Sequence, residues 1–555
     1  MYMTILLALL AALLSVSLAD PARVLIACVA SRPRITSLGL LAKELQEVSG
    51  MEVTLAVPGE AAAWPEVNST SEARVMVAGG GGRASRGGGG GGGADGDESS
   101  AYDRTVRRLS QMAGTWDYAE HVHDEVSRSQ HMYGPLVEAF ADDKPDLMII
   151  DSHTFAAFDV AHTLGVPYIV HHGGLLDAPT FARAYVPAHG TGYSINMRPW
   201  ERCMNFVVPY LHSLALQPSL RQLNGFRASR DLPPVDGHFQ LWDESLFVAS
   251  TAFGLEYARP LSPTTELIGP IEQPGVAPAP CGAEPEPEVD GLDDDATEAD
   301  VMAWLNGVND DVLLVSGLAS LTTAQLVPLA DALERSRKPV LWVGDAARRL
   351  EYGRAPKFRK FAARDGCYAR FLDHSAISMV LAHCDLHEVH STVLAGKPTV
   401  CLPATSQQLD VATRLADAGA GMTLPIYAGS GAGADTGSDV DGSAAQSAQS
   451  AQVAAALKSA IHDATQHSSH QRMSRGVRYL AATMTRAGGV KRAAHLVDSV
   501  IALGGTAHMR PLHLAMPWYS AMCLDVYCAG AATAVALFVA CRLLLAAYSL
   551  LLRVC

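Results

Sequence analysis

The sequence lacks the features that mark several large classes of protein. It contains no block of Lys or Arg, and its formal net charge is −15, so a nucleic-acid partner is not expected. Its 10 cysteines include no Cys-x-x-Cys pair, which argues against a zinc site or a redox motif. No segment repeats along the 555 residues. We therefore expect neither a metal nor a cofactor, and the length fits two large α/β domains.

Three segments have the composition of chain that lies outside a folded core. Residues 79–100 contain two runs of glycine, but neither run has the spacing or the following helix of a phosphate-binding loop. This range is therefore predicted to be a disordered insertion. Residues 272–299 are rich in Pro, Glu and Asp and are predicted to link two domains. Residues 428–452 are rich in Gly, Ser and Ala and are predicted to be an inserted loop.

Both ends of the chain are apolar. Residues 1–19 have the short apolar run and the small residues of a secretory signal, although a buried first strand would show a similar run. Residues 524–552 contain a long apolar run interrupted by Arg542, and a membrane-spanning helix needs about 20 such residues. A buried core helix is the alternative there. A signal and a C-terminal anchor together predict a type I membrane protein with lumenal domains, which a glycosylation sequon at residues 68–70 fits.

Between these ends, apolar strands alternate with helical stretches in two separate halves. In the first half, strands are predicted at residues 23–30, 52–57, 147–150 and 166–170, with helices at 38–48 and 155–164. In the second half, strands are predicted at 312–315, 340–343 and 398–402, with helices at 322–335 and 407–418. Continuous apolar strands joined by helices indicate parallel sheets that are covered on both faces. We therefore predict two doubly wound, Rossmann-like α/β domains, at 20–271 and 300–505, with a ligand-binding cleft between them.

The most informative segment runs from His383 to Asp410. Its first part, His-Cys-Asp-Leu-His-Glu-Val-His-Ser, has the pattern of a turn that follows a strand and leads into a helix, whose N-terminus can hold a diphosphate. The segment resembles the signature of the UDP-glycosyltransferases, the family that includes the UDP-glucuronosyltransferases. The residues that match the signature are His383, Cys384, Gly396, Pro398, Pro403 and Gln408.

The resemblance extends beyond this segment. Residues 505–511 and 518–526 are similar to the stretch through which the family enters its membrane helix, and residues 259–263 and 268–270 match before the predicted linker. The resemblance thus covers nearly the whole chain outside the three low-complexity segments. It implies a GT-B-type fold, with an N-terminal domain that binds the acceptor and a C-terminal domain that binds a UDP-sugar. It also implies a place in the endoplasmic reticulum membrane.

The donor-binding positions depart from the family pattern in several places. Asp385 replaces a glycine, Glu388 replaces a serine that contacts phosphate, and Ser391 replaces a glutamate that holds the ribose. Gln407 replaces an acidic residue that grips sugar hydroxyls, and Phe371 stands near the family's base-stacking motif. A carboxylate at position 388 would repel a diphosphate unless it is protonated or turned away. The donor site implied by the resemblance comprises Ser320, Phe371, His383, Asp385, His387, Glu388, Ser391, Gln407 and Gln408.

Catalysis in this family uses a histidine base near the N-terminus, oriented by an aspartate at the end of a later strand. Asp151 falls at that strand end, although it also has the position of a helix N-cap. Arg32 stands at the base position, and an arginine cannot be a general base because it stays protonated near neutral pH. Three histidines near strand ends could replace the base or could be structural: His153, His171 and His172.

Two functions remain open at this point. The first is the transfer, with inversion, of a hexosyl or glucuronosyl group from a UDP-sugar to the hydroxyl of a lipophilic acceptor. The second is a catalytically degenerate protein of the same fold, which binds lipophiles or pairs with active relatives in the membrane. The residues at Arg32, Glu388, Ser391 and Gln407 favour the second function, whereas the fold and the anchor favour the first. A homo-oligomer is compatible with either.

Overall fold

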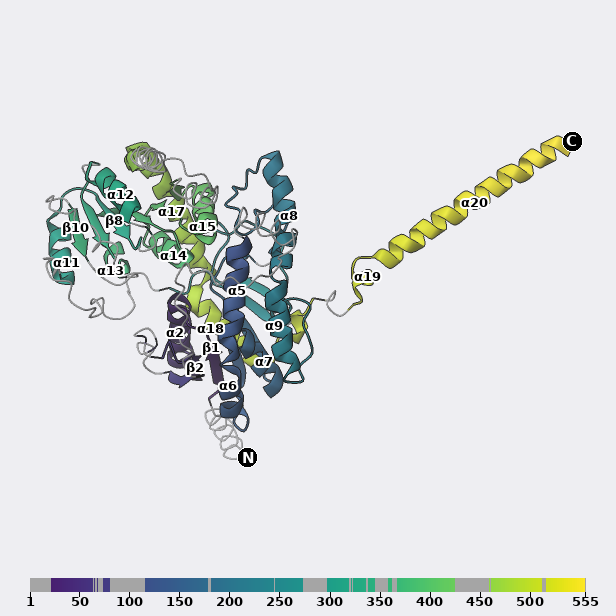
Figure 1. Ribbon diagram of the computed structural model, residues 1–555, viewed down its shortest axis with the longest axis horizontal. Coiled ribbons are helices and arrows are strands. Elements are labelled where there is room, and N and C mark those ends of the chain that lie inside the picture. The colour runs from purple at the N-terminus through teal and green to yellow at the C-terminus, as the bar shows by residue number, and fades with distance from the viewer. Residues whose placement is uncertain are drawn as a thin grey trace, which may run out of the picture.

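The computed structural model describes residues 21–62, 64, 67, 73–79, 115–177, 181–243, 245–272, 297–318, 321, 323–335, 338–344, 358–361, 367–424, 459, 461–511 and 516–554. Several ranges named above lie outside the described residues: 1–19, 68–70, 80–100, 273–296, Ser320 and 428–452. Two α/β lobes lie side by side, and one long helix leaves them (Figure 1).

The first lobe is built on a seven-stranded sheet with the order β3-β2-β1-β4-β5-β6-β7. Its strands are β1 (Arg23–Ala27), β2 (Glu52–Val57), β3 (Arg74–Val77), β4 (Leu147–Asp151), β5 (Tyr168–His172), β6 (Leu246–Ala249) and β7 (Thr265–Leu267). Every neighbouring pair is parallel. The chain order reverses between β1 and β4, and ligands of such sheets bind outside the carboxyl ends of the strands at this point.

Helices bury both faces of this sheet. They are α2 (Arg32–Glu47), α5 (Thr115–Gln130), α6 (Tyr133–Phe140), α7 (Phe155–Leu164), α8 (Pro199–Ala215), α9 (Gln217–Ala228) and α10 (Gln240–Asp243). On one face, Val122 and Val126 of α5 and Phe158 of α7 belong to one core cluster. On the other face, Ile35 and Leu38 of α2 belong to a second cluster. The central strands β1, β4, β5 and β6 are buried on both sides because neither side of the sheet faces water there.

The second lobe repeats this plan on a six-stranded sheet with the order β10-β9-β8-β11-β12-β13. Its strands are β8 (Val312–Ser316), β9 (Val340–Val343), β10 (Phe358–Phe361), β11 (Ile377–Ala382), β12 (Thr399–Cys401) and β13 (Gly421–Thr423). Its helices are α11 (Glu298–Gly307), α12 (Thr323–Arg335), α13 (Ala369–Leu372), α14 (Leu386–Leu394), α15 (Ser406–Asp417) and α17 (His467–Ala487). All strand pairs are parallel. The predicted pair of doubly wound α/β domains is confirmed, and α11 begins at Glu298, inside the range predicted as linker.

The last helix of the folded part returns to the first lobe. Helix α18 (Gly489–Ala502) packs against α2, and its buried residues Ala493, Val497 and Val500 lie in the core cluster of the first sheet. The chain bends between α17 and α18 at Gly488, whose φ is 104°. The range 300–505 therefore contributes to both lobes and not to the second one alone.

Buried charges join the lobes directly. Glu256 of the first lobe lies 2.6 Å from Arg259 and 2.5 Å from Arg414 of α15, and all three side chains are at most 4% exposed. Asp410, one turn earlier on α15, accepts hydrogen bonds from the backbone N–H groups of Gly190 and Gly192. Each buried charge has a partner, which offsets much of the cost of removing it from water. The two carboxyl edges are thereby held facing each other.

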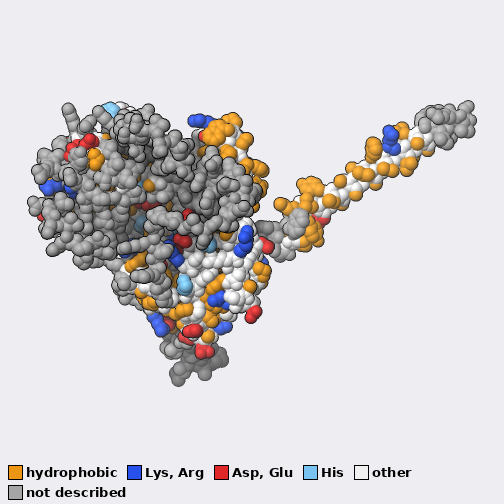
Figure 2. Space-filling model, viewed as in Figure 1, with side chains coloured by type: hydrophobic (Ala, Val, Ile, Leu, Met, Phe, Trp, Pro, Cys, Tyr) orange, Lys and Arg blue, Asp and Glu red, His pale blue; other side chains and the backbone are white. Residues whose placement is uncertain are grey.

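The chain continues past the lobes through η4 (Ala507–Met509) and α19 (Trp518–Ala521) to α20 (Leu524–Val554). Within α20, Leu524–Ala547 is a 24-residue stretch of mean hydropathy 2.0, and none of it is buried. Figure 2 shows this helix as a rod of mostly apolar side chains, with a basic side chain on its outer half. Among the described residues it is the one helix that is long and apolar enough to cross a membrane, by length and composition.

Candidate functional site

Asp151 ends β4 at the carboxyl edge of the first sheet and is fully buried. Its Oδ2 atom lies 3.3 Å from Nη1 of Arg34. The same oxygen accepts hydrogen bonds from the backbone N–H of His153, at 3.2 Å, and from the hydroxyl of Thr154, at 3.4 Å. Asp151 therefore closes the turn that leads into α7 and also binds a guanidinium group.

The cation beside Asp151 is Arg34 and not Arg32. The guanidinium carbon of Arg32 lies 4.9 Å from the ring centre of Trp64, on another side of the helix. Helix α2 begins at Arg32, and residues two apart on a helix point in different directions. Arg32 was assigned to the base position by counting residues from the end of β1. The exact start of α2, which decides where each side chain points, could not be read from the sequence.

Arg34 connects two buried carboxylates. Besides Asp151, its Nη1 atom lies 3.2 Å from Oε1 of Glu125 on α5. Burial raises the pKa of Glu125 to about 7, and Asp151 adds to the rise while Arg34 opposes it. The guanidinium can hold a polar group or an anion, but it cannot accept a proton. The sequence did not single out Glu125, which lies 91 residues from Arg34 along the chain.

The three histidines proposed as substitutes for the base are all buried in this lobe. The hydroxyl of Ser152 lies 3.0 Å from Nδ1 of His153 and 2.8 Å from Nδ1 of His172. Nε2 of His171 lies 2.8 Å from the hydroxyl of Ser250. Burial lowers the pKa of His171 to about 4 and that of His153 well below its usual value. The three residues are 1–7% exposed, so they form a buried polar layer beneath the carboxyl edge.

In the second lobe, the turn after β11 is fixed by covalent and polar contacts. A disulfide joins Cys384 to Cys401 at the end of β12. Nδ1 of His383 donates a hydrogen bond to the carbonyl of Leu402, at 2.8 Å. Cys384 has a φ of 65°, which a non-glycine residue rarely adopts. These contacts hold the turn that precedes α14, and the sequence had not predicted the disulfide.

Side chains of the chain itself bind backbone N–H groups just before α14 and just before α15. Oε2 of Glu388 accepts a hydrogen bond from the backbone N–H of Cys384, at 3.1 Å, and the residue is 8% exposed. Oε1 of Gln408 accepts hydrogen bonds from the backbone N–H groups of Ala404 and Thr405, and its Nε2 donates to Asp385 at 3.0 Å. Glu388 thus faces the helix end, where a diphosphate would also be attracted.

A third carboxylate reaches α14 from the first lobe. Glu272 follows Ile271, which lies in the core of that lobe. Oε2 of Glu272 accepts a hydrogen bond from the hydroxyl of Ser391 at 2.6 Å, and Oε1 lies 2.9 Å from Nδ1 of His387. Burial opposes ionisation, but His387 and His390 lower the pKa of Glu272 to about 2. Ser391 therefore holds a carboxylate of the chain.

Three predicted donor residues do not join this cluster. Phe371 is fully buried, with its ring 5.7 Å from that of Phe361, so neither face is open to a uracil base. This corrects the expectation that Phe371 stacks on the donor, which arose because a core aromatic and a stacking aromatic look alike in sequence. Gln407 is exposed at the start of α15. Ser320 lies outside the described residues.

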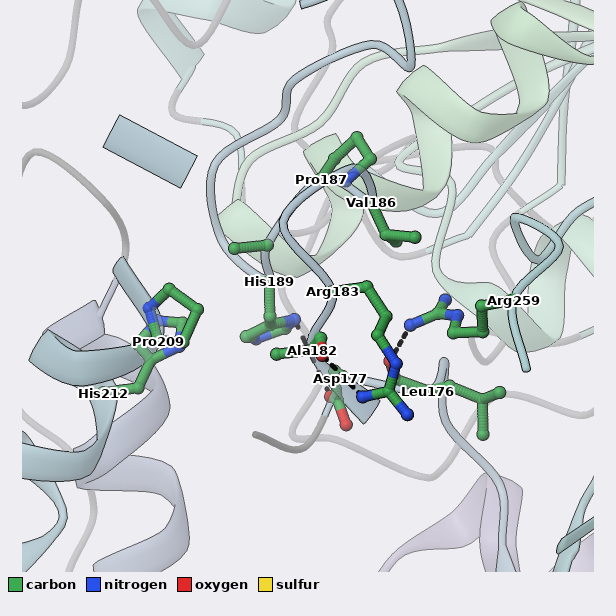
Figure 3. A pocket seen from close by; sticks show the side chains of 11 residues that line it. Leu176, Asp177, Ala182, Arg183, Val186, Pro187, His189, Pro209, His212 and Arg259 are labelled. Carbon is green, nitrogen blue, oxygen red and sulfur yellow. Dashed lines mark hydrogen bonds and ion pairs between the residues drawn. The ribbon is translucent and has the colours of Figure 1, made fainter. Parts of the chain in front are cut away.

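A small cavity lies in the first lobe, beside the contact of His189 with α15 (Figure 3). Its volume of about 20 Å³ is enough for about one water molecule. The ring of His189 lies between two carboxylates, 3.7 Å from Asp177 and 3.3 Å from Asp410. Burial would lower the pKa of His189, but both carboxylates raise it above its usual value. Among the described residues, the hydroxyl of Tyr118 and Nε2 of His212 are buried without hydrogen-bond partners.

Comparison with solved structures identifies the fold. CalG4, the calicheamicin glycosyltransferase, superimposes with a TM-score of 0.55 at 17% identity, over 87% of this chain and 98% of that one. Phytolacca americana UGT2, solved with UDP-2fluoro-glucose and pterostilbene, superimposes with a TM-score of 0.55 at 14% identity, over 87% of this chain and 100% of that one. These likenesses establish the fold, which is that of the GT-B glycosyltransferases.

Sequence comparison identifies the family. The UDP-glucoronosyl and UDP-glucosyl transferase family matches residues 136–554, so the chain belongs to this family. It is 27% identical over 300 residues to the human 2-hydroxyacylsphingosine 1-beta-galactosyltransferase. The aligned stretch covers 52% of this chain and 51%, about half, of that protein. It is 24% identical over 410 residues to the human UDP-glucuronosyltransferase 1A10, which covers 70% of this chain and 67% of that protein.

Proposed function

We propose that this protein transfers a hexosyl or glucuronosyl group from a UDP-sugar to a hydroxyl of a lipophilic acceptor, with inversion at the anomeric carbon. The observation that carries the proposal is the joined start of two helices that match the family signature: the turn into α14 carries His383 and Cys384, and Gln408 of α15 binds Asp385 of that turn. That turn lies at the carboxyl edge of the second sheet, as Asp151 with its partner Arg34 lies at the carboxyl edge of the first. Membership of the family and the names of its relatives support a UDP-sugar donor and a lipophilic acceptor.

A second function is favoured by specific contacts at the same turn. Glu388 and Glu272 each bind groups of α14 or its preceding turn that could otherwise bind a ligand. If these carboxylates always stay bound to their partners, a UDP-sugar cannot take their place. Such a protein would bind a lipophile, or a relative in the membrane, without transferring sugar. Donor affinity separates the two functions because only the enzyme needs to bind UDP.

The direct test is calorimetric titration of the full-length protein, in detergent micelles, with UDP. Binding in the micromolar range is expected for a transferase of this family. The absence of heat at millimolar UDP would favour the degenerate protein. UMP serves as the matched control because it lacks the second phosphate, which the N-terminus of α14 is expected to hold.

We further propose a single-pass type I topology in the endoplasmic reticulum membrane. Helix α20 would be the anchor, since its 24-residue apolar stretch has the length of a membrane span. The lobes would then lie in the lumen, where the Cys384–Cys401 disulfide is compatible with an oxidising compartment.

A further inference from the structure

Helix α5 carries a histidine and a carboxylate one turn apart, beside the carboxyl edge of the first sheet. Nε2 of His121 lies 3.4 Å from Oε1 of Glu125. The same carboxylate lies 3.2 Å from Nη1 of Arg34, which in turn contacts Asp151 at the end of β4. His121 is thus joined through two side chains to the strand end at which ligands bind in sheets of this type.

His121 is the open end of a row of histidine rings. Its ring lies 5.8 Å from the ring of His153, which lies 5.9 Å from the ring of His172. The side chain of His121 is 43% exposed, whereas that of Glu125 is 7% exposed. Within the described parts of the chain, Nδ1 of His121 has no hydrogen-bond partner. One ring nitrogen therefore faces a buried carboxylate, and the other is free to meet a ligand.

We propose that His121 is the general base of the sugar transfer and that Glu125 is the residue that positions it. This inference rests on the proposed function. Nδ1 of His121 takes the proton of the acceptor hydroxyl while the hydroxyl oxygen forms a bond to the anomeric carbon of the donor. The bond between that carbon and the diphosphate oxygen breaks, and UDP leaves with the electron pair. His121 then returns its proton to water.

The charges around His121 suit a base. Burial lowers the pKa of His121 and Arg34 lowers it further, so the ring is neutral at pH 7 and can accept a proton. The ionised Glu125 carboxylate holds the proton on Nε2 and stabilises the imidazolium that forms, as carboxylates do in other histidine pairs. The remaining groups that act on His121 or Glu125, or face them, are Asp124, Arg128, Asp151, Asp177 and His153.

Glu125 gives this base a distinctive pH dependence. Its pKa is raised to about 7, so the carboxylate is ionised only above that pH. A protonated Glu125 would instead donate its proton to Nε2, which would leave Nδ1 protonated and unable to act. We therefore expect kcat to rise with pH through an apparent pKa near 7.

The test uses the full-length protein in detergent micelles, with UDP-galactose and a 2-hydroxyacyl ceramide. His121→Gln is expected to lower kcat by about 10²- to 10⁴-fold, the range for loss of a general base, with KM for the donor changed less than about threefold. His123→Gln, an exposed histidine on the same helix, is the matched control and should retain full activity. Glu125→Gln should lower kcat and abolish the rise near pH 7, and Glu125→Asp should restore part of both.

Two results would overturn the assignment. One is a kcat for His121→Gln within about twofold of the wild type, and the other is an unchanged pH profile in Glu125→Gln. Because a substitution can act through folding, His121→Ala is also assayed with added imidazole, which should restore turnover if only the base is missing. An absence of rescue in a variant that still binds UDP contradicts the inference. A wild-type protein that binds no UDP and transfers no sugar contradicts the proposed function. The assignment of His121 as the base would then be contradicted as well, because it rests on that function.

Discussion

Two carboxylates of the chain lie against the first half of α14, the helix end at which a diphosphate would be held. Glu388 accepts the backbone N–H of Cys384, and Glu272 is held by His387 and Ser391. A helix N-terminus attracts a phosphate and a carboxylate for the same reason, since both are anions. The charge at these positions is therefore expected to control how tightly a UDP-sugar binds.

Replacing Glu388 with serine is expected to tighten UDP binding several-fold. Like charges about 4 to 6 Å apart cost roughly 3 to 4 kcal/mol at an effective dielectric of about 20, before screening by salt. A quarter of that energy already changes affinity several-fold, since about 1.4 kcal/mol is a factor of ten. Titration calorimetry with UDP at low and moderate salt measures the effect, with Glu334→Ser on the exposed side of α12 as control. Equal or weaker binding by Glu388→Ser would show that this carboxylate does not face the donor.

The pair of His387 and Glu272 should stabilise the protein most in mildly acid solution. Burial opposes protonation of His387, but Glu272 raises its pKa above the usual 6.5, so its contribution is complete below that pH and fades as pH rises. Glu272 has its pKa lowered to about 2, so its contribution is complete above about 4.5. His387→Gln should therefore lower the Tm by roughly 2–4 °C near pH 5.5, and by much less at pH 8.5.

Thermal unfolding at the two pH values checks this prediction. His495→Gln, an exposed histidine on α18, is the control and should shift the Tm at neither pH. A loss of stability by His387→Gln that is the same at both pH values would mean that the ring acts by packing and not by charge.

Single residues differ in how far the sequence could predict them. His383 and Gln408 were both assigned to the donor site because one signature carries both. Arg34 was missed by two residues because the start of α2 decides which side chain faces Asp151. Glu272 was missed for another reason: its contact with Ser391 spans 119 residues and forms only when the two lobes come together.

At the level of elements, the joint between α17 and α18 fixes how the chain returns to the first lobe. The backbone N–H of Gly489 donates a hydrogen bond to the carbonyl of Ile268 at 2.6 Å. Gly269 follows with a φ of +79°, and a Cβ atom there would lie 2.5 Å from the carbonyl oxygen of Met484. A glycine is required at this contact because both the backbone angle and the space exclude a side chain.

Gly269→Ala is therefore expected to destabilise the protein by about 1–3 kcal/mol. Gly225→Ala is the matched control, since Gly225 lies within α9 with no atom near the added Cβ, and it should be neutral or stabilise by up to about 1 kcal/mol. Denaturant unfolding of both variants measures the difference. If Gly269→Ala and Gly225→Ala have the same free energy of unfolding, the backbone at the joint between α17 and α18 can move to accept a side chain without loss of stability.

The sequence predicted seven of the thirteen strands that the structure describes, namely β1, β2, β4, β5, β8, β9 and β12, because these are short apolar runs that are mostly buried. It gave no range for the other six, and the edge strands β3 and β7 among them lack a buried apolar run. It assigned α18 to the second lobe, since the helix follows α17 in the chain and nothing in its composition says which core it joins. Its amphipathic pattern fits either lobe, and only the bend at Gly488 directs it to α2.

At the scale of the whole molecule, α20 stands apart from the lobes and is the proposed anchor (Figure 1). If the lobes are lumenal, protease added to intact microsomes should leave them uncut, and protease added after detergent should digest them. A cytosolic protein of known location serves as the control for protease activity. Digestion of the lobes in sealed microsomes would contradict the type I topology.

The measurement that tests the central proposal most directly is the analysis of product formed from an α-linked UDP-sugar and a lipophilic alcohol. Full-length protein in micelles is incubated in parallel with UDP-galactose, UDP-glucose and UDP-glucuronic acid, each with a hydroxyacyl ceramide and with a phenol. We expect at least one pair to yield a glycoside whose anomeric proton shows the β configuration by NMR, together with free UDP in equal amount. An α-linked product would contradict inversion. No product from any pair, in a protein that is folded by its unfolding transition, would contradict the transferase itself.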